Sequence, residues 1–274
     1  MPADAGIETR EARPAGFKAR PTTRLRRGVA PDMIANLRIT ARLIAMLVAL
    51  LIALPLHGLW RLLRQRSPWP PIFLGWIARI VGARTRIVGT PLPRDVLYLA
   101  NHMSWLDILV IAGASGSAFV AKGELEDVPV IGWLSTLNHT VFVDRGDRLG
   151  VARQVDMLRD ALAADHPVTI FPEGTTDGAG VRLLPFKAAL LGAVDPPAPG
   201  LMVQPVHVDY GAATRDIAWI GDDPGLANAL RVLGRPGRIA VTLTFLAPFD
   251  PAGMGRKAVA ARARDAIAAV MRAG

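Results

Sequence analysis

The sequence predicts an α/β protein with a largely parallel sheet covered by helices, preceded by a pair of membrane-associated helices. From about residue 84 onward, short β-rich runs alternate with longer segments compatible with helices, the pattern of sheets whose strands have helical connections. Before them lies the run 43–60, which carries no formal charge, and the chain begins with a polar, basic stretch. We therefore expect a basic disordered arm (1–31), membrane-anchoring helices (32–83) and an α/β domain that carries the chemistry (84–274).

The composition narrows the possible partners. The chain has 274 residues, 51% of them hydrophobic, with a mean hydropathy of +0.30 and a formal net charge of +9. This hydropathy is high for a freely soluble enzyme, and the positive charge favours nucleic acid, an acidic membrane surface or a phosphorylated substrate as partner. Because the chain has no cysteine, disulfides, cysteine nucleophiles and thiolate metal sites are excluded.

The arm 1–31 is rich in Arg, Pro, Ala and Thr, a composition typical of disorder. Its basic residues could bind nucleic acid, but neither interleaved aromatic residues nor a nucleic-acid-binding signature accompanies them. Contact with anionic lipid headgroups fits the following apolar segment better, so we expect membrane lipids and no nucleic acid as partners. The basic residues are Arg10, Arg13, Lys18, Arg20, Arg24, Arg26 and Arg27.

The run 43–60 is at the lower length limit for a membrane-spanning helix, and Pro55 and Gly58 are expected to weaken or kink its final turns. Basic residues flank the run on both sides, so the charge bias that normally sets the orientation of a spanning helix nearly cancels. A second apolar patch follows at Pro71–Val81. We interpret the two segments as a helical pair that dips into one leaflet with both ends cytoplasmic. A single spanning helix is the alternative; two buried core helices fit less well, because the first run lacks a polar face.

The α/β part can be assigned element by element from β-branched runs and from longer segments bounded by turn residues. We assign no element to 211–236, which is rich in Gly, Asp and Pro. The expected strands are Thr85–Thr90, Asp95–Ala100, Ala118–Ala121, Thr140–Val143, Pro167–Phe171, Leu201–Val208 and Ile239–Phe245. The expected helices are Ser104–Ala114, Val130–Asn138, Leu149–Ala164, Lys187–Val194 and Arg256–Met271.

The most informative local pattern is the junction that follows the expected strand Asp95–Ala100. His102 and Asp107 are five residues apart, which in one regular helix would place their side chains about 140° apart. If His102 instead precedes a helix capped by Ser104, Asp107 falls in the first turn and the two side chains can meet. The carboxylate would then fix the imidazole tautomer as His102 takes a proton. Alternatively, Asp107 only caps the helix.

Two further strand ends carry polar residues. After Phe171 come Pro172, Glu173, Gly174 and Thr175, a turn that could bind an anion, with Glu173 as a hydrogen-bond acceptor for a substrate hydroxyl or a partner of an arginine. Arg145 follows another strand and could bind phosphate, or could pair with a neighbouring aspartate. Lys122 and Lys187 are further cations whose roles the pattern leaves open. Each of these sets could also be an ordinary strand-to-loop turn.

In this order, the blocks resemble the glycerolipid acyltransferase family, whose best-known member is 1-acyl-glycerol-3-phosphate acyltransferase. The resemblance runs from about Arg84 to Val208, and the apolar segments before it resemble the family's membrane-dipping helical pair. It implies a glycerol-3-phosphate acyltransferase-like fold for residues 84–274. The blocks are HxxxxD at His102–Asp107, FVDR at Phe142–Arg145, FPEGT at Phe171–Thr175 and QPV at Gln204–Val206.

The resemblance also implies a mechanism. His102 would deprotonate the acceptor hydroxyl with support from Asp107, and the hydroxyl would attack the thioester of acyl-CoA or acyl carrier protein. No cofactor and no metal are implied, and the expected location is the cytoplasmic face of a bacterial inner membrane. The implied substrate-binding residues are Asn101, Lys122, Arg145, Phe171, Pro172, Glu173, Gly174, Thr175 and Lys187.

The acceptor is less sharply defined. Phosphate-accepting members of the family commonly have a basic residue directly after the FPEGT block, whereas this chain has Thr176. In this respect the chain resembles the branch that acylates lyso-ornithine lipid, an aminolipid without phosphate. We expect 1-acyl-glycerol-3-phosphate as acceptor, giving phosphatidic acid in phospholipid biosynthesis, with lyso-ornithine lipid as the alternative. Two further hypotheses are an unrelated hydroxyl or amine acceptor and a non-catalytic lipid-binding or scaffold protein of the same fold.

Overall fold

The computed structural model describes residues 33–123, 131–138, 140–143, 159–162, 166–176, 182–221 and 223–273. The expected disordered arm (1–31) and most of the expected helix Leu149–Ala164 lie outside these residues. The expected strands all lie within them.

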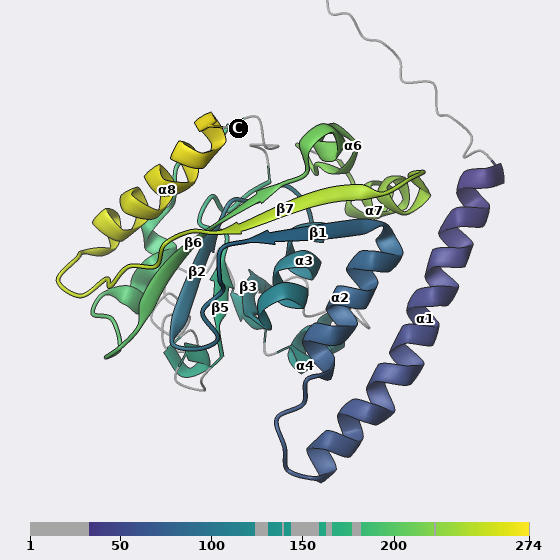
Figure 1. Ribbon diagram of the computed structural model, residues 1–274, viewed down its shortest axis with the longest axis horizontal. Helices are drawn as coiled ribbons and strands as arrows, with labels where there is room; N and C mark the ends of the chain where they lie inside the picture. Colours follow the sequence, from purple (N-terminus) through teal and green to yellow (C-terminus); the bar gives the residue numbers. More distant parts are fainter. Residues whose placement is uncertain are drawn as a thin grey trace, which may run out of the picture. The chain divides into compact units, whose positions relative to one another are not determined.

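In the described part of the α/β domain, the strands form a seven-stranded sheet with the order β1-β7-β6-β2-β5-β3-β4. Figure 1 labels all of these strands except β4. Among these described strands, β6 and β7 form the one antiparallel pair and the other neighbouring pairs are parallel, which confirms the predicted largely parallel sheet. All seven expected strands are present, with ends that differ by at most two residues. The strands are β1 (Ala83–Val88), β2 (Val96–Ala100), β3 (Ala118–Lys122), β4 (Val141–Val143), β5 (Val168–Ile170), β6 (Met202–Asp209) and β7 (Ile239–Phe245).

Strand β2 is buried on both faces, because helices cover both sides of the sheet. Val96, Tyr98 and Ala100 belong to one core cluster, together with residues of α2 (Trp69–Val81) and α3 (Leu106–Ser115). Leu97 and Leu99 belong to the cluster on the opposite face, together with α8 (Arg256–Ala273). Successive side chains of a strand point to opposite faces, so a fully apolar strand suits a central position.

Helix α2 is packed tightly on α3. A methyl group built on Gly113 of α3 would lie 2.7 Å from the Cα of Gly75 in α2. Glycine at position 113 therefore allows the two backbones to approach more closely than a side chain there would permit, whereas a Cβ at Gly75 would make an ordinary 3.5 Å contact with Gly113. The second of the two expected anchoring helices thus contributes part of its surface to the core of the α/β domain: Ala78 and Val81 are buried in the α2–α3 cluster.

Helix α1 (Met33–Leu62) is the one described helix that is long and apolar enough to cross a membrane. It continues through Pro55 and Gly58, so the weakening expected there does not end the helix. Only 11% of its most apolar 18-residue window is buried, which leaves most of its apolar side chains exposed. Large exposed apolar surfaces mark sites of membrane or protein contact.

Two arginines of α1 form hydrogen bonds with the C-terminal end of the helix α7 (Gly225–Gly234). Arg42 donates a hydrogen bond to the Leu233 carbonyl (2.7 Å) and another to the Arg235 carbonyl (3.1 Å), and Arg38 donates to the Gly234 carbonyl. The last carbonyls of a helix have no partner within the helix, and a cation is favoured beside them. The two arginines therefore cap α7 from α1.

The remaining described helices lie where the sequence predicts a helix, except in the stretch 211–236, which received no assignment. The expected helix Val130–Asn138 is α4 (Ile131–Leu137), and the C-terminal helix is α8. The expected helix Lys187–Val194 is a 3-10 helix, η2 (Ala188–Val194). The unassigned stretch 211–236 contains η3 (Gly211–Ala213), α6 (Thr214–Ile217) and α7.

Candidate active site

His102 and Asp107 meet at the end of β2. The strand ends at Ala100, α3 begins at Leu106, and the irregular turn between them carries His102. The imidazole Nδ1 of His102 lies 2.8 Å from Oδ2 of Asp107. The histidine lies before the helix and the aspartate in its first turn, as expected. The expected N-cap assignment of Ser104 is wrong, because the N-cap residue is Trp105, whose side chain makes no capping bond.

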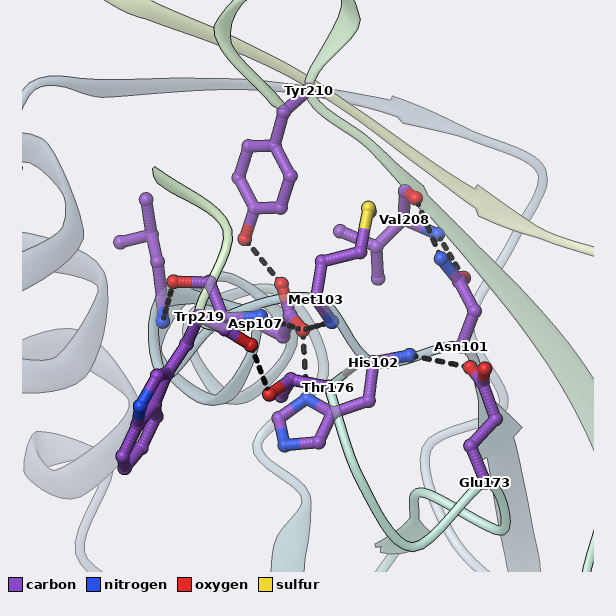
Figure 2. Close-up of polar contacts among 11 residues, drawn as sticks. Asn101, His102, Met103, Asp107, Glu173, Thr176, Val208, Tyr210 and Trp219 are labelled. Carbon is purple, nitrogen blue, oxygen red and sulfur yellow. Dashed lines mark hydrogen bonds and ion pairs between the residues drawn. The ribbon is translucent and has the colours of Figure 1, made fainter. Parts of the chain in front are cut away.

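The Asp107 carboxylate is fully buried and accepts hydrogen bonds from two sides (Figure 2). Its Oδ2 accepts the backbone N–H of Met103 (2.6 Å) and of Ser104 (2.9 Å) in addition to the bond with His102. Its Oδ1 accepts the hydroxyl of Tyr210 at 2.6 Å. Both proposed roles of Asp107 therefore hold: it caps the start of the helix and also orients the imidazole.

Phe171 supports the imidazole from its flat side. The two rings are stacked, with centroids 3.9 Å apart and planes inclined by 13°. Phe171 follows β5, which is hydrogen-bonded to β2, so parallel neighbours bring the two strand ends together. Phe171, which was expected to bind substrate, contacts His102, whose side chain remains 19% exposed; the substrate-binding role of Phe171 stays a prediction.

Glu173 is part of the scaffold of the site. One oxygen of its carboxylate accepts the backbone N–H of His102 and the other that of Leu184, both at 2.9 Å. The residue is 2% exposed and both of its oxygens are bonded to backbone, and the expectation that it accepts a substrate hydroxyl or pairs with an arginine stays a prediction. Burial raises the pKa of the Glu173 carboxyl above its ordinary value, whereas the two backbone bonds favour the charged form.

Asn101 is likewise part of the scaffold. Its amide donates to the carbonyl of Val208 (2.9 Å) and accepts the backbone N–H of Val208 (2.8 Å). The side chain thereby extends the pairing of β2 with β6 by one residue, and it is 3% exposed. The structure thus gives Asn101 a scaffold role, and the expectation that it also binds substrate stays a prediction.

The turn after Phe171 is shaped by two close contacts. The carbonyl of Pro172 accepts the backbone N–H of Lys187 at 2.8 Å. Gly174 has a φ of +71°, and a Cβ at this position would lie 2.8 Å from Nζ of Lys187. The ammonium group of Lys187 thus lies directly over the turn that also contains Thr175, which brings these expected substrate-binding residues together.

Trp219 connects this turn with the His102 turn. Its backbone N–H donates to the carbonyl of Met103 (2.9 Å), and its own carbonyl accepts the hydroxyl of Thr176 (Figure 2). Thr176 is the position that differs from the phosphate-accepting pattern, and its hydroxyl is occupied by this bond. A small cavity beside the turns is lined by Asn101, His102, Met103, Glu173, Arg182, Leu183 and Met271.

Two expected substrate-binding residues are not placed by the structure. Arg145 lies outside the described residues. Lys122 ends β3, but its side chain is likewise outside them. Their roles stay predictions.

Sequence reasoning missed Tyr210 and Trp219. Tyr210 follows directly after β6, and Trp219 lies in the stretch that received no assignment. The chain has only two tyrosines, and Tyr210 comes shortly after a predicted strand. This position is the one sequence feature that could have indicated a role in the site. Nothing local to Trp219 indicates that its backbone joins two loops.

The arrangement is suited to proton transfer. Nδ1 of His102 faces a buried carboxylate, which stabilises the imidazolium form, so a proton from a substrate would be taken at Nε2. Phe171 and Asp107 hold the ring in place before a substrate arrives. The prediction that no metal participates remains a prediction.

Comparison with known proteins gives concordant results. Residues 84–209 match the family model described as Acyltransferase. The chain is 34% identical over 78% of its length to a lyso-ornithine lipid O-acyltransferase of Rhodobacter capsulatus, of which it covers 78%. It is 33% identical over 67% of its length to a 1-acyl-sn-glycerol-3-phosphate acyltransferase of Neisseria gonorrhoeae, of which it covers 73%. The crystal structure of the 1-acyl-sn-glycerophosphate acyltransferase PlsC from Thermotoga maritima has the same fold, with a TM-score of 0.52 and 23% identity over 85% of this chain and 97% of that one.

Proposed function

This chain belongs to the acyltransferase family and is an O-acyltransferase, and we propose that it moves a fatty acyl group from a thioester to the hydroxyl of a lysolipid with His102 as general base. The observation that carries the proposal is the 2.8 Å contact between Nδ1 of His102 and the buried Asp107 carboxylate. This contact leaves Nε2 as the nitrogen that receives the substrate proton.

The proposed reaction needs no covalent enzyme intermediate. Nε2 of His102 removes the proton of the acceptor hydroxyl while the hydroxyl oxygen attacks the thioester carbonyl carbon. The carbon–sulfur bond then breaks, the leaving thiolate takes the proton from the imidazolium, and an ester is formed. Asp107 holds its charge next to the imidazolium throughout. Acyl-CoA or acyl carrier protein is the proposed donor, and no cofactor is required.

The first proposed acceptor is 1-acyl-glycerol-3-phosphate. Relatives from two Neisseria species carry the name of this activity and match two thirds of the chain. Two cations adjoin the turn that would receive the phosphate: Lys187 lies over Gly174, and Arg182 lines the cavity beside His102. Cations placed in this way can hold a phosphate monoester.

Lyso-ornithine lipid is the second candidate, and Thr176 favours it. Threonine carries no charge, and the hydroxyl of Thr176 donates to the Trp219 carbonyl, so this position offers no cation to the acceptor site. Relatives from Rhodobacter, Brucella, Pseudomonas and Rhizobium that match this chain are named lyso-ornithine lipid O-acyltransferases. An acceptor without phosphate has no need of a cation at this position.

One assay distinguishes the two acceptors. The purified protein is given a labelled acyl group as CoA thioester and as carrier-protein thioester, with each lysolipid in parallel micelles. A phospholipid product supports the first acceptor, and an ornithine lipid product supports the second. Transfer to neither lysolipid from either donor would contradict both.

We also propose that the protein works at a membrane, with α1 in contact with lipid at the cytoplasmic face. The exposed apolar surface of α1 supports this location. The basic residues at and just after the end of α1, Arg61, Arg64 and Arg66, suit an anionic lipid surface.

A further inference from the structure

We propose that Tyr210 is a positioning residue for the general base, the outer member of a hydrogen-bonded chain that runs from Tyr210 through Asp107 to His102. The inference rests on the proposed function, since it concerns the residue that takes the substrate proton. Tyr210 follows β6 and is separated from Asp107 by 103 positions in the sequence, so only the fold brings the two together.

The hydrogen bonds of Asp107 are divided unequally between its two oxygens. Oδ2 accepts His102, Met103 and Ser104, whereas Tyr210 is the donor to Oδ1 within the described part of the chain. A buried carboxylate oxygen without a donor is costly, because the charge has lost its hydration. The Tyr210 hydroxyl, at 2.6 Å, replaces that hydration.

The same bond also fixes the direction of the carboxylate. With Oδ2 on the helix start and Oδ1 on Tyr210, rotation of the Asp107 carboxylate would break bonds at both oxygens. The carboxylate is therefore held with one oxygen on Nδ1 of His102. This arrangement keeps the proton on Nδ1 and keeps Nε2 as the acceptor, which is the tautomer that the reaction needs.

Tyr210 remains a neutral donor under ordinary conditions. Burial, and then the neighbouring Asp107 charge, raise the pKa of its phenol well above the ordinary value. The residue is 1% exposed, so it is out of reach of a substrate in the site. Its effect on the reaction must therefore pass through Asp107, which makes it a positioning residue.

The chain supplies a matched control. Tyr98, the other tyrosine, is fully buried in the same core cluster, and its hydroxyl donates to the backbone carbonyl of Leu92 at 2.5 Å. Tyr98→Phe and Tyr210→Phe each remove one buried phenol hydroxyl, but only Tyr210→Phe removes a donor from Asp107. Any general effect of losing such a bond on stability should appear in both variants.

The test compares full-length Tyr210→Phe, Tyr98→Phe and wild type in steady-state acyl transfer. We expect Tyr210→Phe to lower kcat by about tenfold or more, with the KM for the acceptor changed by less than about twofold. Tyr98→Phe should keep kcat within about twofold of wild type. Equal kcat values for the two Phe variants would overturn the proposal.

A double variant separates positioning from general damage. In the His102→Ala background the base is gone, so Tyr210→Phe should cause no further loss of the residual rate. An equal loss in both backgrounds would overturn the proposal. Near wild-type turnover of His102→Ala alone would instead contradict the proposed function, so the two failures can be told apart.

A gentler substitution covers the case in which Tyr210→Phe does not fold. Biosynthetic 3-fluorotyrosine in the Tyr98→Phe protein alters only position 210 and keeps the hydroxyl as a stronger donor. Because the hydroxyl still donates to Oδ1, the carboxylate stays in position, and kcat should remain within about twofold of that of the Tyr98→Phe protein. A fall in kcat of about tenfold or more with the hydroxyl still in place would contradict the proposal.

Discussion

The imidazole of His102 lies flat on the ring of Phe171, with 3.9 Å between the ring centroids. Phe171 is itself stacked on Phe119 of β3, at 5.9 Å. The aromatic face limits tilting of the imidazole, while the Asp107 bond limits its rotation. A base held in this way loses little freedom when a substrate binds, which favours the proton-transfer step.

The first prediction concerns His102 itself. His102→Ala should reduce turnover by about 10²–10⁴-fold, because general-base catalysis contributes about that much. Asp107 keeps its bonds from Met103, Ser104 and Tyr210, so the fold should persist. Acyl transfer and the thermal unfolding midpoint are measured on the same preparation. A variant that turns over at nearly the wild-type rate would rule out His102 as the base.

The second prediction distinguishes scaffold from substrate contact at Asn101. Asn101→Ala leaves the buried N–H and carbonyl of Val208 without their side-chain partner. We expect the free energy of unfolding to fall by about 2–6 kcal/mol, from about 1–3 kcal/mol for each of the two unsatisfied groups. Denaturant unfolding measures this loss. An unchanged stability together with a raised KM for the acceptor would favour the substrate-binding role instead.

Asn101 and Glu173 have scaffold roles that the sequence pattern does not predict. Both residues are polar and occur at strand ends, where a sequence pattern indicates an active site. Their partners are backbone groups far along the chain, at separations of 107 residues for Val208 and 71 residues for His102. No local pattern reports such a distant backbone partner.

The strands, in contrast, could be predicted closely. β2 and β6 are short apolar runs that end at polar residues, and both lie centrally in the sheet, where apolar residues are required on both faces. The stretch 211–236 could not be assigned, because its short helices are held by tertiary contacts. Asn228, for example, accepts a bond from the Trp105 indole and donates to the Ala218 carbonyl.

The third prediction tests the close crossing of α2 and α3. Gly113→Ala places a methyl group 2.7 Å from the Cα of Gly75, and backbone cannot move aside as cheaply as a side chain. We expect a loss of about 1–3 kcal/mol in the free energy of unfolding. Gly58→Ala in α1 is the control, since a Cβ there meets nothing within 4 Å. The control should be neutral or stabilising by up to about 1 kcal/mol; equal effects of the two substitutions would refute the tight crossing.

The fourth prediction concerns alkaline pH. Burial raises the pKa of both Tyr98 and Tyr210 above the ordinary value of 10.0. Above about pH 10, unfolded tyrosines ionise while the folded ones stay protonated, so stability should fall as pH rises. The fall should reach about 1.4 kcal/mol per pH unit for each tyrosine.

Tyrosinate absorbance provides the measurement for this effect. Because the chain has two tyrosines and both are buried, the absorbance should appear only together with unfolding. The double variant Tyr98→Phe, Tyr210→Phe should lose stability less steeply between about pH 10 and about pH 11. Tyrosinate formation in the folded protein near about pH 10 would contradict the prediction.

The fifth prediction tests the membrane contact of α1. Leu47 and Leu51 are 55% and 62% exposed, one turn apart on the helix. Changing both to Lys should release the protein from membranes during a wash at about 1 M salt, which screens the basic residues but not apolar contacts. Ile87→Lys on the edge strand β1 is the control for an added charge at an exposed apolar site. Wild-type protein that is itself removed by salt would indicate purely electrostatic attachment.

Helix α1 is held against the α/β domain by side-chain hydrogen bonds as well as by the chain connection. Arg38 and Arg42 bind it to the end of α7, and Asn228 near the start of α7 is bonded to Trp105, three residues after the base. Through these bonds α1 is connected to α7, and α7 is connected to the turn that carries His102. The depth at which α1 settles in a lipid layer would therefore set the height of Nε2 above that layer, and with it the part of a lysolipid that the base can reach.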